Sequence, residues 1–475
     1  MEIAPVDVGR FASVLPPDRF AAFERGVQEA RELLDGRVVW NINSTAKGGG
    51  VVELLRPLVA YARGAGVDAR WMVIDGSPEF FTITKRIHNR LHGMAGDGGP
   101  LDPSTRRVYD QVLAENLAAF EGRVREGDIV VVHDPQPAGM IPALLADGAY
   151  VIWRCHVGLD RPNELARETW EFLKHYIVEA HAYVFSRASF AWEGLPADRI
   201  VVIPPSIDAF APKNVDLDGE TVSAVLRAAG LVTDPLDAEP HGPVTFRILD
   251  GSPARIERRA DVVEDEPLRP DDPVVLQVSR WDALKDPLGV VEGFGRFVPA
   301  ETGAHLLYAG PSVEAVADDP EGRRLLREAI ATRQRLPGEA RRRVHLASLP
   351  MDDPDENAIM VNALQRHARV IVQKSLAEGF GLTVSEAMWK ARPVVASRVG
   401  GIAEQIVHGE TGLLLDDPHD LAAYGAAVTV LLGDERRAEE MGQRARERVR
   451  DRFLSARSLL DYLALIRKIL GPVTV

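Results

Sequence analysis

The chain has 475 residues, 46% of them hydrophobic, and a formal net charge of −14 at pH 7. This length exceeds one ordinary domain and predicts two domains of about 200 residues each. The acidic balance argues against a general nucleic-acid or anionic-membrane surface, because its field repels polyanions, so an anionic ligand needs a local cluster of cations. The single cysteine, Cys155, excludes an intrachain disulfide and fits a small buried residue in a reducing compartment.

The N-terminal residues have no basic segment followed by an apolar run, and no stretch reaches the roughly 18 apolar residues of a membrane span. We therefore expect a cytoplasmic protein. No Cys/His set has zinc spacing, and no Gly-x-Ser-x-Gly elbow occurs, so the sequence predicts no metal site and disfavours a hydrolase.

In the first half, a helical pattern over residues 11–35 leads into a series of near-continuous apolar strand candidates. These are residues 37–44, 70–75, 128–133, 150–155, 181–186 and 200–204. Helical segments lie between them, such as 78–92, where Phe80, Ile83, Ile87 and Leu91 share one stripe. Apolar strands that alternate with helices indicate a parallel sheet covered on both faces.

The same pattern restarts in the second half, with strand candidates at 273–279, 304–310, 343–346, 370–373 and 393–397. The fold class is therefore α/β, with two doubly wound units and a cleft between them. We expect an N-terminal domain over 1–212, a second domain over 273–455 and a C-terminal helix over 456–475 that packs back on the first domain. Residues 213–272 are interpreted as an inserted linker or hairpin, with a strand from Val244 and its return over 255–263.

One stretch combines chemistry with a characteristic turn: Glu378-Gly-Phe-Gly-Leu-Thr-Val-Ser-Glu386-Ala-Met. It follows a short strand and runs into a helix. Its glycines let a ligand approach the main chain, and the helix start suits a phosphate. The two carboxylates are then left to bind neutral hydroxyls. A nucleotide-sugar has this combination of groups, and we expect it to contact Glu378, Gly379, Phe380, Gly381, Leu382 and Glu386.

A second glycine-rich turn, Asn41-Ile-Asn43-Ser-Thr-Ala-Lys47-Gly48-Gly49-Gly50, follows the first strand. Its main-chain amides can reach a phosphate or sugar. It is not a P-loop, because the lysine precedes the glycines. The helix after it has a predicted inner face of Val51, Leu54, Leu55 and Leu58, and Pro57 predicts a kink or an early stop.

Charged and polar residues also follow other strands. Arg280 and Lys285 come after the first strand of the second half, and together they can neutralise a diphosphate and stabilise it as a leaving group. His133-Asp134 and His156 end two strands of the first half. Ligands of open α/β sheets bind beyond such strand ends.

With these residues in view, the sequence resembles retaining glycosyltransferases of the GT-B type, which have two Rossmann-like domains. Within that family it is similar to the trehalose glycosyltransferring synthases. The resemblance is carried by strings spread over most of the chain: 41–50, Thr84-Lys-Arg-Ile-His-Asn-Arg-Leu-His-Gly, His133-Asp-Pro-Gln-Pro, Trp153-Arg-Cys-His, Pro204-Pro-Ser-Ile-Asp, Glu378 to Lys390 and His408-Gly-Glu-Thr-Gly. Residues 215–270 lie outside it.

The resemblance implies that glucose moves from a nucleoside diphosphate glucose, ADP- or UDP-glucose, to free glucose, forming trehalose in a reversible reaction. It implies that Glu386 binds the ribose, Glu378 the donor glucose, and Arg280 and Lys285 the diphosphate. A further set follows by the same analogy: Gly48, Gly49 and Gly50 near the diphosphate, His156 at the donor sugar, and Asn43, Lys47, Asp134 and His156 on the acceptor side. Arg280, Lys285, His156 and Glu378 form the implied catalytic set.

The favoured mechanism in this family is front-face attack, in which the departing phosphate oxygen takes the acceptor's proton, so no residue is assigned as general base. No cofactor is required, and Mg²⁺ assistance, the preferred nucleotide and a homodimer stay open. Three alternatives also stay open: a retaining trehalose phosphorylase that uses inorganic phosphate, a nucleotide-sugar epimerase of the same architecture, and a silent sugar-binding protein.

Overall fold

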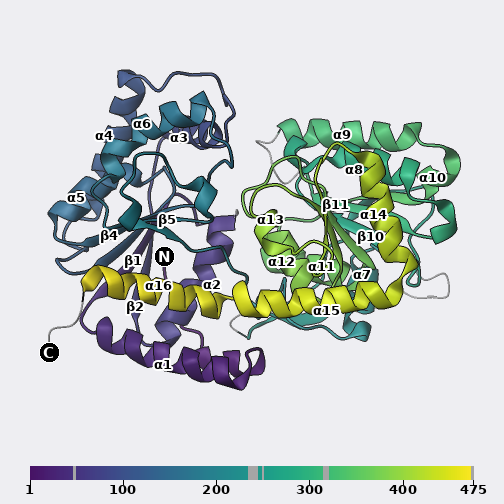
Figure 1. Cartoon of the computed structure of the whole chain (residues 1–475), viewed down its shortest axis with the longest axis horizontal. Helices are drawn as coiled ribbons and strands as arrows, with labels where there is room; N and C mark the ends of the chain where they lie inside the picture. Colours follow the sequence, from purple (N-terminus) through teal and green to yellow (C-terminus); the bar gives the residue numbers. More distant parts are fainter. Residues whose placement is uncertain (47–49, 234–243, 249–250, 314–319, 472–475) are drawn as a thin grey trace. The chain divides into compact units, whose positions relative to one another are not determined.

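The structure is a computed structural model, and it describes all residues except 47–49, 234–243, 249–250, 314–319 and 472–475. The chain divides into two compact units. Unit 1 comprises Met1–Ser206 together with Phe453–Val475, and unit 2 comprises Ile207–Arg452. Each unit is built around its own sheet, parallel throughout in unit 1 and parallel except for one edge strand in unit 2 (Figure 1).

The sheet of unit 1 has six strands in the order β2-β1-β3-β4-β5-β6, all paired in parallel. Its strands are β1 Val38–Asn43, β2 Asp68–Val73, β3 Ile129–His133, β4 Tyr150–Cys155, β5 Ala182–Phe185 and β6 Ile200–Val202. Each of the predicted strands of the first half is present with ends shifted by a few residues. The crossover order, with β1 inside the sheet, places the carboxyl ends of β1, β3 and β4 side by side.

Helices cover both faces of this sheet (Figure 1). The helices of unit 1 are α1 Pro17–Leu33, α2 Gly50–Gly64, α3 Pro78–Leu91, α4 Pro103–Ala119, α5 Ile141–Ala146, α6 Glu164–Ile177 and α16 Ser455–Leu470, with 3-10 turns η1 Val8–Ser13, η2 Ala138–Met140, η3 Ala188–Phe190 and η4 Ala197–Arg199. Strand β3 shows why both faces are apolar. Val130 and Val132 pack with α3 to α6, whereas Ile129 and Val131 pack with α2 and α16.

The C-terminal helix α16 belongs to unit 1, where it contacts α1 and α2. Figure 1 shows it in yellow beside these helices. Its attachment is polar as well as apolar, because Arg457 donates to the carbonyl of Pro204 at 2.7 Å and Ser458 to the hydroxyl of Ser206 at 2.9 Å.

Helix α2 differs from its prediction in two respects. It continues through Pro57 to Gly64, so the early stop is wrong. Its buried residues include Val52 and Val59, whereas Val51 and Leu58 are only partly buried. Burial of seven α2 side chains outweighs the roughly 3 kcal/mol that an interior proline costs.

The sheet of unit 2 has seven strands in the order β15-β14-β13-β10-β11-β12-β9, and β9 is antiparallel to β12. Its strands are β9 Asp261–Val263, β10 Val274–Val278, β11 His305–Pro311, β12 Val344–Leu349, β13 Val370–Gln373, β14 Val394–Ser397 and β15 Leu413–Leu415. The helices of unit 2 are α7 Gly219–Ala228, α8 Pro287–Phe297, α9 Pro320–Arg335, α10 Gly338–Arg342, α11 Pro354–His367, α12 Leu382–Trp389, α13 Ile402–Gln405, α14 Leu421–Gly433 and α15 Glu435–Arg452, with η5 Ala283–Lys285 and η6 Ala300–Thr302.

Residues 213–272 contain more regular structure than a linker. Helix α7 packs against α11, and the predicted hairpin is present as β7 Thr245–Arg247 and β8 Pro253–Arg255. Its second strand ends at Arg255 and does not extend to 263, because Asp261–Val263 forms β9 at the edge of the large sheet. The segment thereby adds a strand to unit 2.

A buried carboxylate fixes this segment to the unit. Glu356 on α11 is 1% exposed and accepts the backbone N–H groups of Glu257 and Arg258 and the guanidinium of Arg258, at 2.5 to 2.7 Å. A leucine at 356 removes all three acceptor contacts, whereas a glutamine keeps a carbonyl oxygen for the two amides.

We expect Glu356→Leu to destabilise unit 2 by about 3 kcal/mol, because buried amides without a partner cost about 1–3 kcal/mol each. Glu356→Gln should cost about 1 kcal/mol. Thermal and urea unfolding of both variants measures the difference. Equal losses in the two variants would contradict the proposed anchoring role.

No described helix is long and apolar enough to cross a membrane. Cys155 is fully buried, as expected from the sequence, and its thiol donates to the carbonyl of Val157 at 3.2 Å. Burial raises the pKa of this thiol, which is consistent with a structural residue.

Candidate active site

The glycine turn that begins near Glu378 joins β13 to α12, as the sequence predicts, and Glu386 lies within the helix. Gly381 has φ +80°, in the left-handed region, and directly precedes the helix. Hydrogen bonds to main-chain carbonyls hold the turn. The amide of Gly401 donates to the carbonyl of Gly379 at 2.8 Å, and the side chain of Gln405 donates to the carbonyl of Phe380. Phe380 is 7% exposed and anchors the turn in the core.

Lys285 and Glu378, which are 93 residues apart in the sequence, form an ion pair. Their side chains are 15% and 12% exposed. Ser375 donates to the same carboxylate oxygen of Glu378 at 3.3 Å, and Gln373 donates to Ser375 at 3.0 Å. The structure therefore joins the residues that follow β10 and β13 into one polar cluster.

Arg280 lies outside this cluster. Its side chain is 70% exposed and pairs with Asp282 at 2.7 Å, and its carbonyl accepts from the Tyr308 hydroxyl at 3.1 Å. Trp281, next to it, is 2% exposed and holds the loop by donating to the carbonyl of Pro311 at 3.0 Å. The guanidinium is thus carried by a fixed loop.

At the far end of α12, Glu386 is 4% exposed. The ammonium of Lys213 lies 3.6 Å from its Oε1. Lys390, one turn further, donates to the Glu386 carbonyl and to Asn214 at 3.1 Å each. Burial lowers the pKa of Lys390 well below its usual value, although the negative charge of Glu386 acts to raise it.

Gly400 supports the turn from behind and has φ +51°. A Cβ on Gly400 would lie 1.7 Å from the carbonyl oxygen of Glu378. A side chain at this position therefore has no space unless the backbone of Glu378 moves. The close approach explains why glycine occupies residue 400.

We expect Gly400→Ala to destabilise unit 2, because the added methyl group displaces Glu378. For any reaction in which Glu378 binds the substrate, kcat/KM should fall at least 100-fold. The matched control is Gly303→Ala, since Gly303 has φ +63° but no atom within 4 Å of its Cβ position. Left-handed strain alone should cost the control about 1 kcal/mol and leave activity unchanged. Kinetics and thermal unfolding of both variants test this, and an active Gly400→Ala enzyme would contradict it.

In unit 1, Asp134 follows β3 with φ +64°, a left-handed conformation that is rare for residues other than glycine. Its Oδ1 accepts the backbone N–H of His156 at 2.7 Å, and its own N–H donates to the carbonyl of Arg154 at 2.7 Å. The ends of β3 and β4 are thereby tied together. Burial raises the pKa of the Asp134 carboxyl to about 7.

His156 is partly buried and contacts His133, with 3.2 Å between His156 Nε2 and His133 Nδ1. The other ring nitrogen of His133, Nε2, lies 3.0 Å from Oδ1 of Asn41. Burial, aided by Arg154, lowers the pKa of His133 to about 3 and that of His156 well below its usual value. Both imidazoles are therefore neutral at pH 7.

The remaining predicted residues have mixed outcomes. Lys47, Gly48 and Gly49 lie outside the described residues. Gly50 begins α2. Asn43 is 3% exposed and has structural contacts, since it accepts from the Trp71 indole at 2.7 Å and donates to the carbonyl of Thr45 at 2.7 Å.

Three features of these clusters were not predicted from the sequence. Lys213 lies in a segment without periodicity, so nothing marked it as a partner of Glu386. Ser375 is one of many serines. Asn41 carried a usable signal, because it stands on β1 between Val39 and Asn43 on one face of the strand, where the pattern favours an apolar residue.

Two doubly wound units with polar clusters at strand ends are the architecture of the GT-B fold. The chain is a glycosyltransferase with the GT-B fold. A solved structure, described as an alpha,alpha-trehalose-phosphate synthase (UDP-forming) from Burkholderia xenovorans in complex with glucose-6-phosphate, matches with a TM-score of 0.66 at 14% identity, over 92% of this chain and 100% of that one. At this identity the match concerns the fold.

The family follows from sequence comparison. The family model "Trehalose synthase, N-terminal domain" matches residues 41–192, and "Glycosyl transferases group 1" matches residues 352–448. The trehalose synthase of Rubrobacter xylanophilus is 37% identical over 94% of this chain and 94% of its own length. The chain therefore belongs to the trehalose synthase family. The trehalose phosphorylase of Pleurotus pulmonarius is more distant, with 27% identity over 90% of this chain and 56% of its own.

Proposed function

We propose that the protein transfers glucose from ADP- or UDP-glucose to free glucose, with retention of the anomeric configuration, to form α,α-trehalose. The observation that carries this proposal is the Lys285–Glu378 pair at the glycine turn before α12. A carboxylate suited to sugar hydroxyls here meets a cation suited to a phosphate. The UDP-forming synthase among the solved structures supports a nucleotide donor.

In this proposal unit 2 binds the donor. The diphosphate takes Lys285 and Arg280 as cationic partners, together with the main-chain amides at the start of α12. Lys285 exchanges its contact with Glu378 for the phosphate, which frees the Glu378 carboxylate to accept hydroxyls of the glucose. Glu386, with Lys213 beside it, accepts the ribose hydroxyls.

Unit 1 supplies Asp134 and His156, which bind the acceptor and the transferred sugar. The bond between the anomeric carbon and the phosphate oxygen breaks, and a bond from that carbon to the acceptor oxygen forms on the same face. The acceptor's proton moves to the departing phosphate oxygen, so the charges balance without a protein base. Catalysis then depends on positioning and on cationic stabilisation of the leaving group.

A product assay with purified protein tests the proposal. Glucose is supplied with ADP-glucose or with UDP-glucose, and trehalose and its anomeric configuration are measured by NMR. Glucose-6-phosphate replaces glucose in a parallel reaction, and EDTA or Mg²⁺ is added to test metal assistance. We expect trehalose from at least one donor with free glucose. No product from either donor would overturn the proposal.

Trehalose phosphorylase is the second candidate, favoured by the more distant relative. Trehalose plus inorganic phosphate, and trehalose plus ADP or UDP, are therefore incubated separately. Glucose 1-phosphate formed only in the phosphate reaction would replace the synthase proposal with the phosphorylase. A nucleoside diphosphate glucose formed from trehalose would support the reversible synthase.

Gly379 offers a test of close donor approach. A Cβ on Gly379 would meet no atom within 4 Å, so this glycine is not required by the packing of the protein. We expect Gly379→Ala to leave the unfolding midpoint unchanged and to raise the donor KM about tenfold, since the methyl group occupies space that the donor needs. Steady-state kinetics with varied donor checks this. An unchanged KM would show that the ligand does not approach this residue.

A further inference from the structure

Three side chains at the ends of adjacent strands form a hydrogen-bonded chain in unit 1. Oδ1 of Asn41, on β1, lies 3.0 Å from Nε2 of His133, on β3. Nδ1 of His133 lies 3.2 Å from Nε2 of His156, which follows β4. Asn41 and His133 have no role in the proposed reaction so far, although they stand behind a residue that has one.

With Oδ1 of the Asn41 amide facing His133, the chain has a direction, because a carbonyl oxygen can only accept. Nε2 of His133 must therefore carry the proton that Oδ1 of Asn41 accepts. A neutral imidazole has one N–H, so Nδ1 of His133 is an acceptor, and Nε2 of His156 must donate to it. The proton of His156 is then on Nε2, and its Nδ1 carries a lone pair. Among the described residues, none forms a hydrogen bond with this Nδ1.

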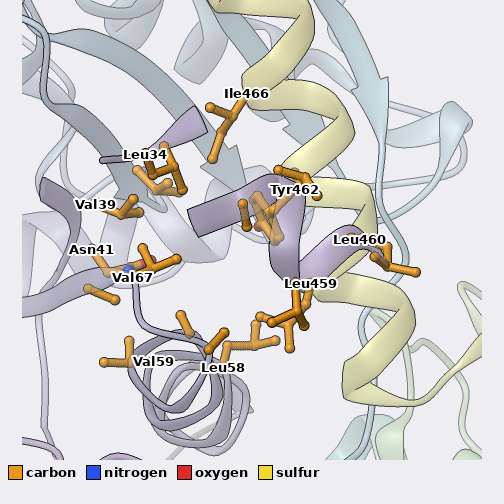
Figure 2. Close-up of a pocket in the computed structure, with 18 of the residues that line it drawn as sticks. Leu34, Val39, Asn41, Leu58, Val59, Val67, Leu459, Leu460, Tyr462 and Ile466 are labelled. Atoms are coloured by element: carbon orange, nitrogen blue, oxygen red, sulfur yellow. The ribbon is translucent and has the colours of Figure 1, made fainter. Parts of the chain in front are cut away.

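The surroundings preserve this arrangement. Asn41 and His133 border a cavity of about 110 Å³ whose other lining is almost wholly apolar and comes from α1, α2, α16 and the sheet (Figure 2). Figure 2 shows Asn41 among aliphatic side chains such as Val39, Val59 and Val67. Apart from His133 itself, none of the described residues that line this cavity is an acidic or basic residue.

The ionisable groups around the two histidines lie on β4, at the end of β3 and on α16. Arg154, on β4, is 2% exposed and donates to the carbonyl of Ile203 and to Ser186. It disfavours a positive charge on both histidines. Asp134 accepts the backbone N–H of His156, not a ring nitrogen. Tyr462 and Arg457 on α16 are also within electrostatic range of Arg154. Within the described part of the chain, none of these groups accepts a ring proton of either histidine.

We propose that Asn41 and His133 are positioning residues that hold His156 in the Nε2–H tautomer, so that its Nδ1 accepts a hydrogen bond from a sugar hydroxyl. The hydroxyl contact rests on the proposed function, whereas the tautomer does not. A ring of the opposite tautomer would present an N–H to the hydroxyl and would require it to accept.

NMR of protein labelled with ¹⁵N in histidine measures the tautomers directly, from the nitrogen shifts and their couplings to ring protons. His133→Gln and His156→Gln identify the two rings by loss of their signals. We expect the Nε2–H form for both rings in the wild type. In Asn41→Leu, which has a similar size but no acceptor, both rings should become mixtures of tautomers. A wild-type Nδ1–H form of His156, or unchanged tautomers in Asn41→Leu, would overturn the inference.

Kinetics provide the second measurement. Asn41→Leu should lower kcat for sugar transfer about tenfold with little change in donor KM. The matched control is Val131→Ala, since Val131 pairs with Asn41 in the sheet register and lines the same cavity without a polar atom. It should lower the unfolding midpoint while leaving kcat and the tautomers unchanged. If Val131→Ala also lowered kcat tenfold, the effect of Asn41→Leu would be explained by the packing of this cavity, and the positioning role of Asn41 would be contradicted.

The two hypotheses fail separately. Wild-type protein that makes no trehalose from nucleotide-glucose contradicts the proposed function, but its histidine tautomers remain measurable. If the wild type forms trehalose but His156 has the Nδ1–H form, the inference alone is contradicted. The same holds if the tautomer of His156 does not change in Asn41→Leu.

Discussion

Replacing Lys285 with alanine should lower kcat/KM for trehalose formation about 10³-fold, or about 4 kcal/mol of transition-state stabilisation. The ammonium is within a partly buried cluster, 15% exposed, so its charge is less screened by water than that of a surface lysine. The negative charge of the leaving diphosphate grows as the glycosidic bond to it breaks. A fixed cation nearby therefore stabilises the transition state more than the bound donor.

The variant also leaves Glu378 without its cation, and this second effect must be separated from the first. The double variant Lys285→Ala/Glu378→Gln removes the unpaired charge. We expect its unfolding midpoint to recover towards the wild-type value, while kcat/KM stays low. Recovery of kcat/KM together with stability would mean that Lys285 only neutralises Glu378. Lys285→Arg is the conservative control and should retain more activity than alanine, because it keeps the charge.

The sequence predicts the fold well because the strongest signals are local. Strand β3 has apolar residues at 129, 130, 131 and 132, and only a strand covered on both faces accommodates them. The glycine turn before α12 is likewise encoded within a few residues, and it lies at the predicted place. The C-terminal helix α16 and the stripe of α3, with Ile87 at 0% exposure, follow from periodicity.

The clusters are less predictable because they depend on pairs that are far apart in the chain. The sequence marks Lys285 and Glu378 separately, but their contact across 93 residues follows from the order of β10 and β13 in the sheet. Lys213 belongs to a segment interpreted as linker, and only the fold brings it to Glu386. The predicted strand over 255–263 includes β9, but its predicted partner was the strand from Val244, whereas β9 pairs with β12, more than 80 residues further along the chain.

Asp134 gives the second large effect, which depends on pH. Burial raises the pKa of its carboxyl to about 7 from a usual value of 3.8. An ionised carboxylate is the stronger acceptor for the hydroxyl of the acceptor glucose. We therefore expect kcat/KM of the wild type to rise with pH and to level off above an apparent pKa near 7. Asp134→Asn should be about 10²-fold less active at pH 8 and flat across this range.

The raised pKa of Asp134 predicts that stability falls as pH rises, whereas kcat/KM increases. Between pH 4 and 7 the native protein keeps a proton that the unfolded chain releases, so this carboxyl lowers stability as pH rises, by at most about 4 kcal/mol. Asparagine avoids that cost and still accepts the His156 N–H. Asp134→Asn should therefore match the wild type near pH 4 and exceed it at pH 8, with activity and stability moving in opposite directions.

The neighbouring histidines do not confuse this comparison. Their lowered pKa values affect stability in the opposite direction. Below about pH 6.5 the unfolded chain binds protons at these histidines that the native protein does not bind, so the fold loses stability as the pH falls. The wild type and Asp134→Asn share this effect of the histidines, so it cancels in the difference between their stabilities. Thermal unfolding from pH 4 to 8 measures that difference, with Asp147→Asn, an exposed carboxylate of unit 1, as the control. A difference that does not change with pH would mean that Asp134 is ionised throughout and that its conformation, not its charge, matters at this strand end.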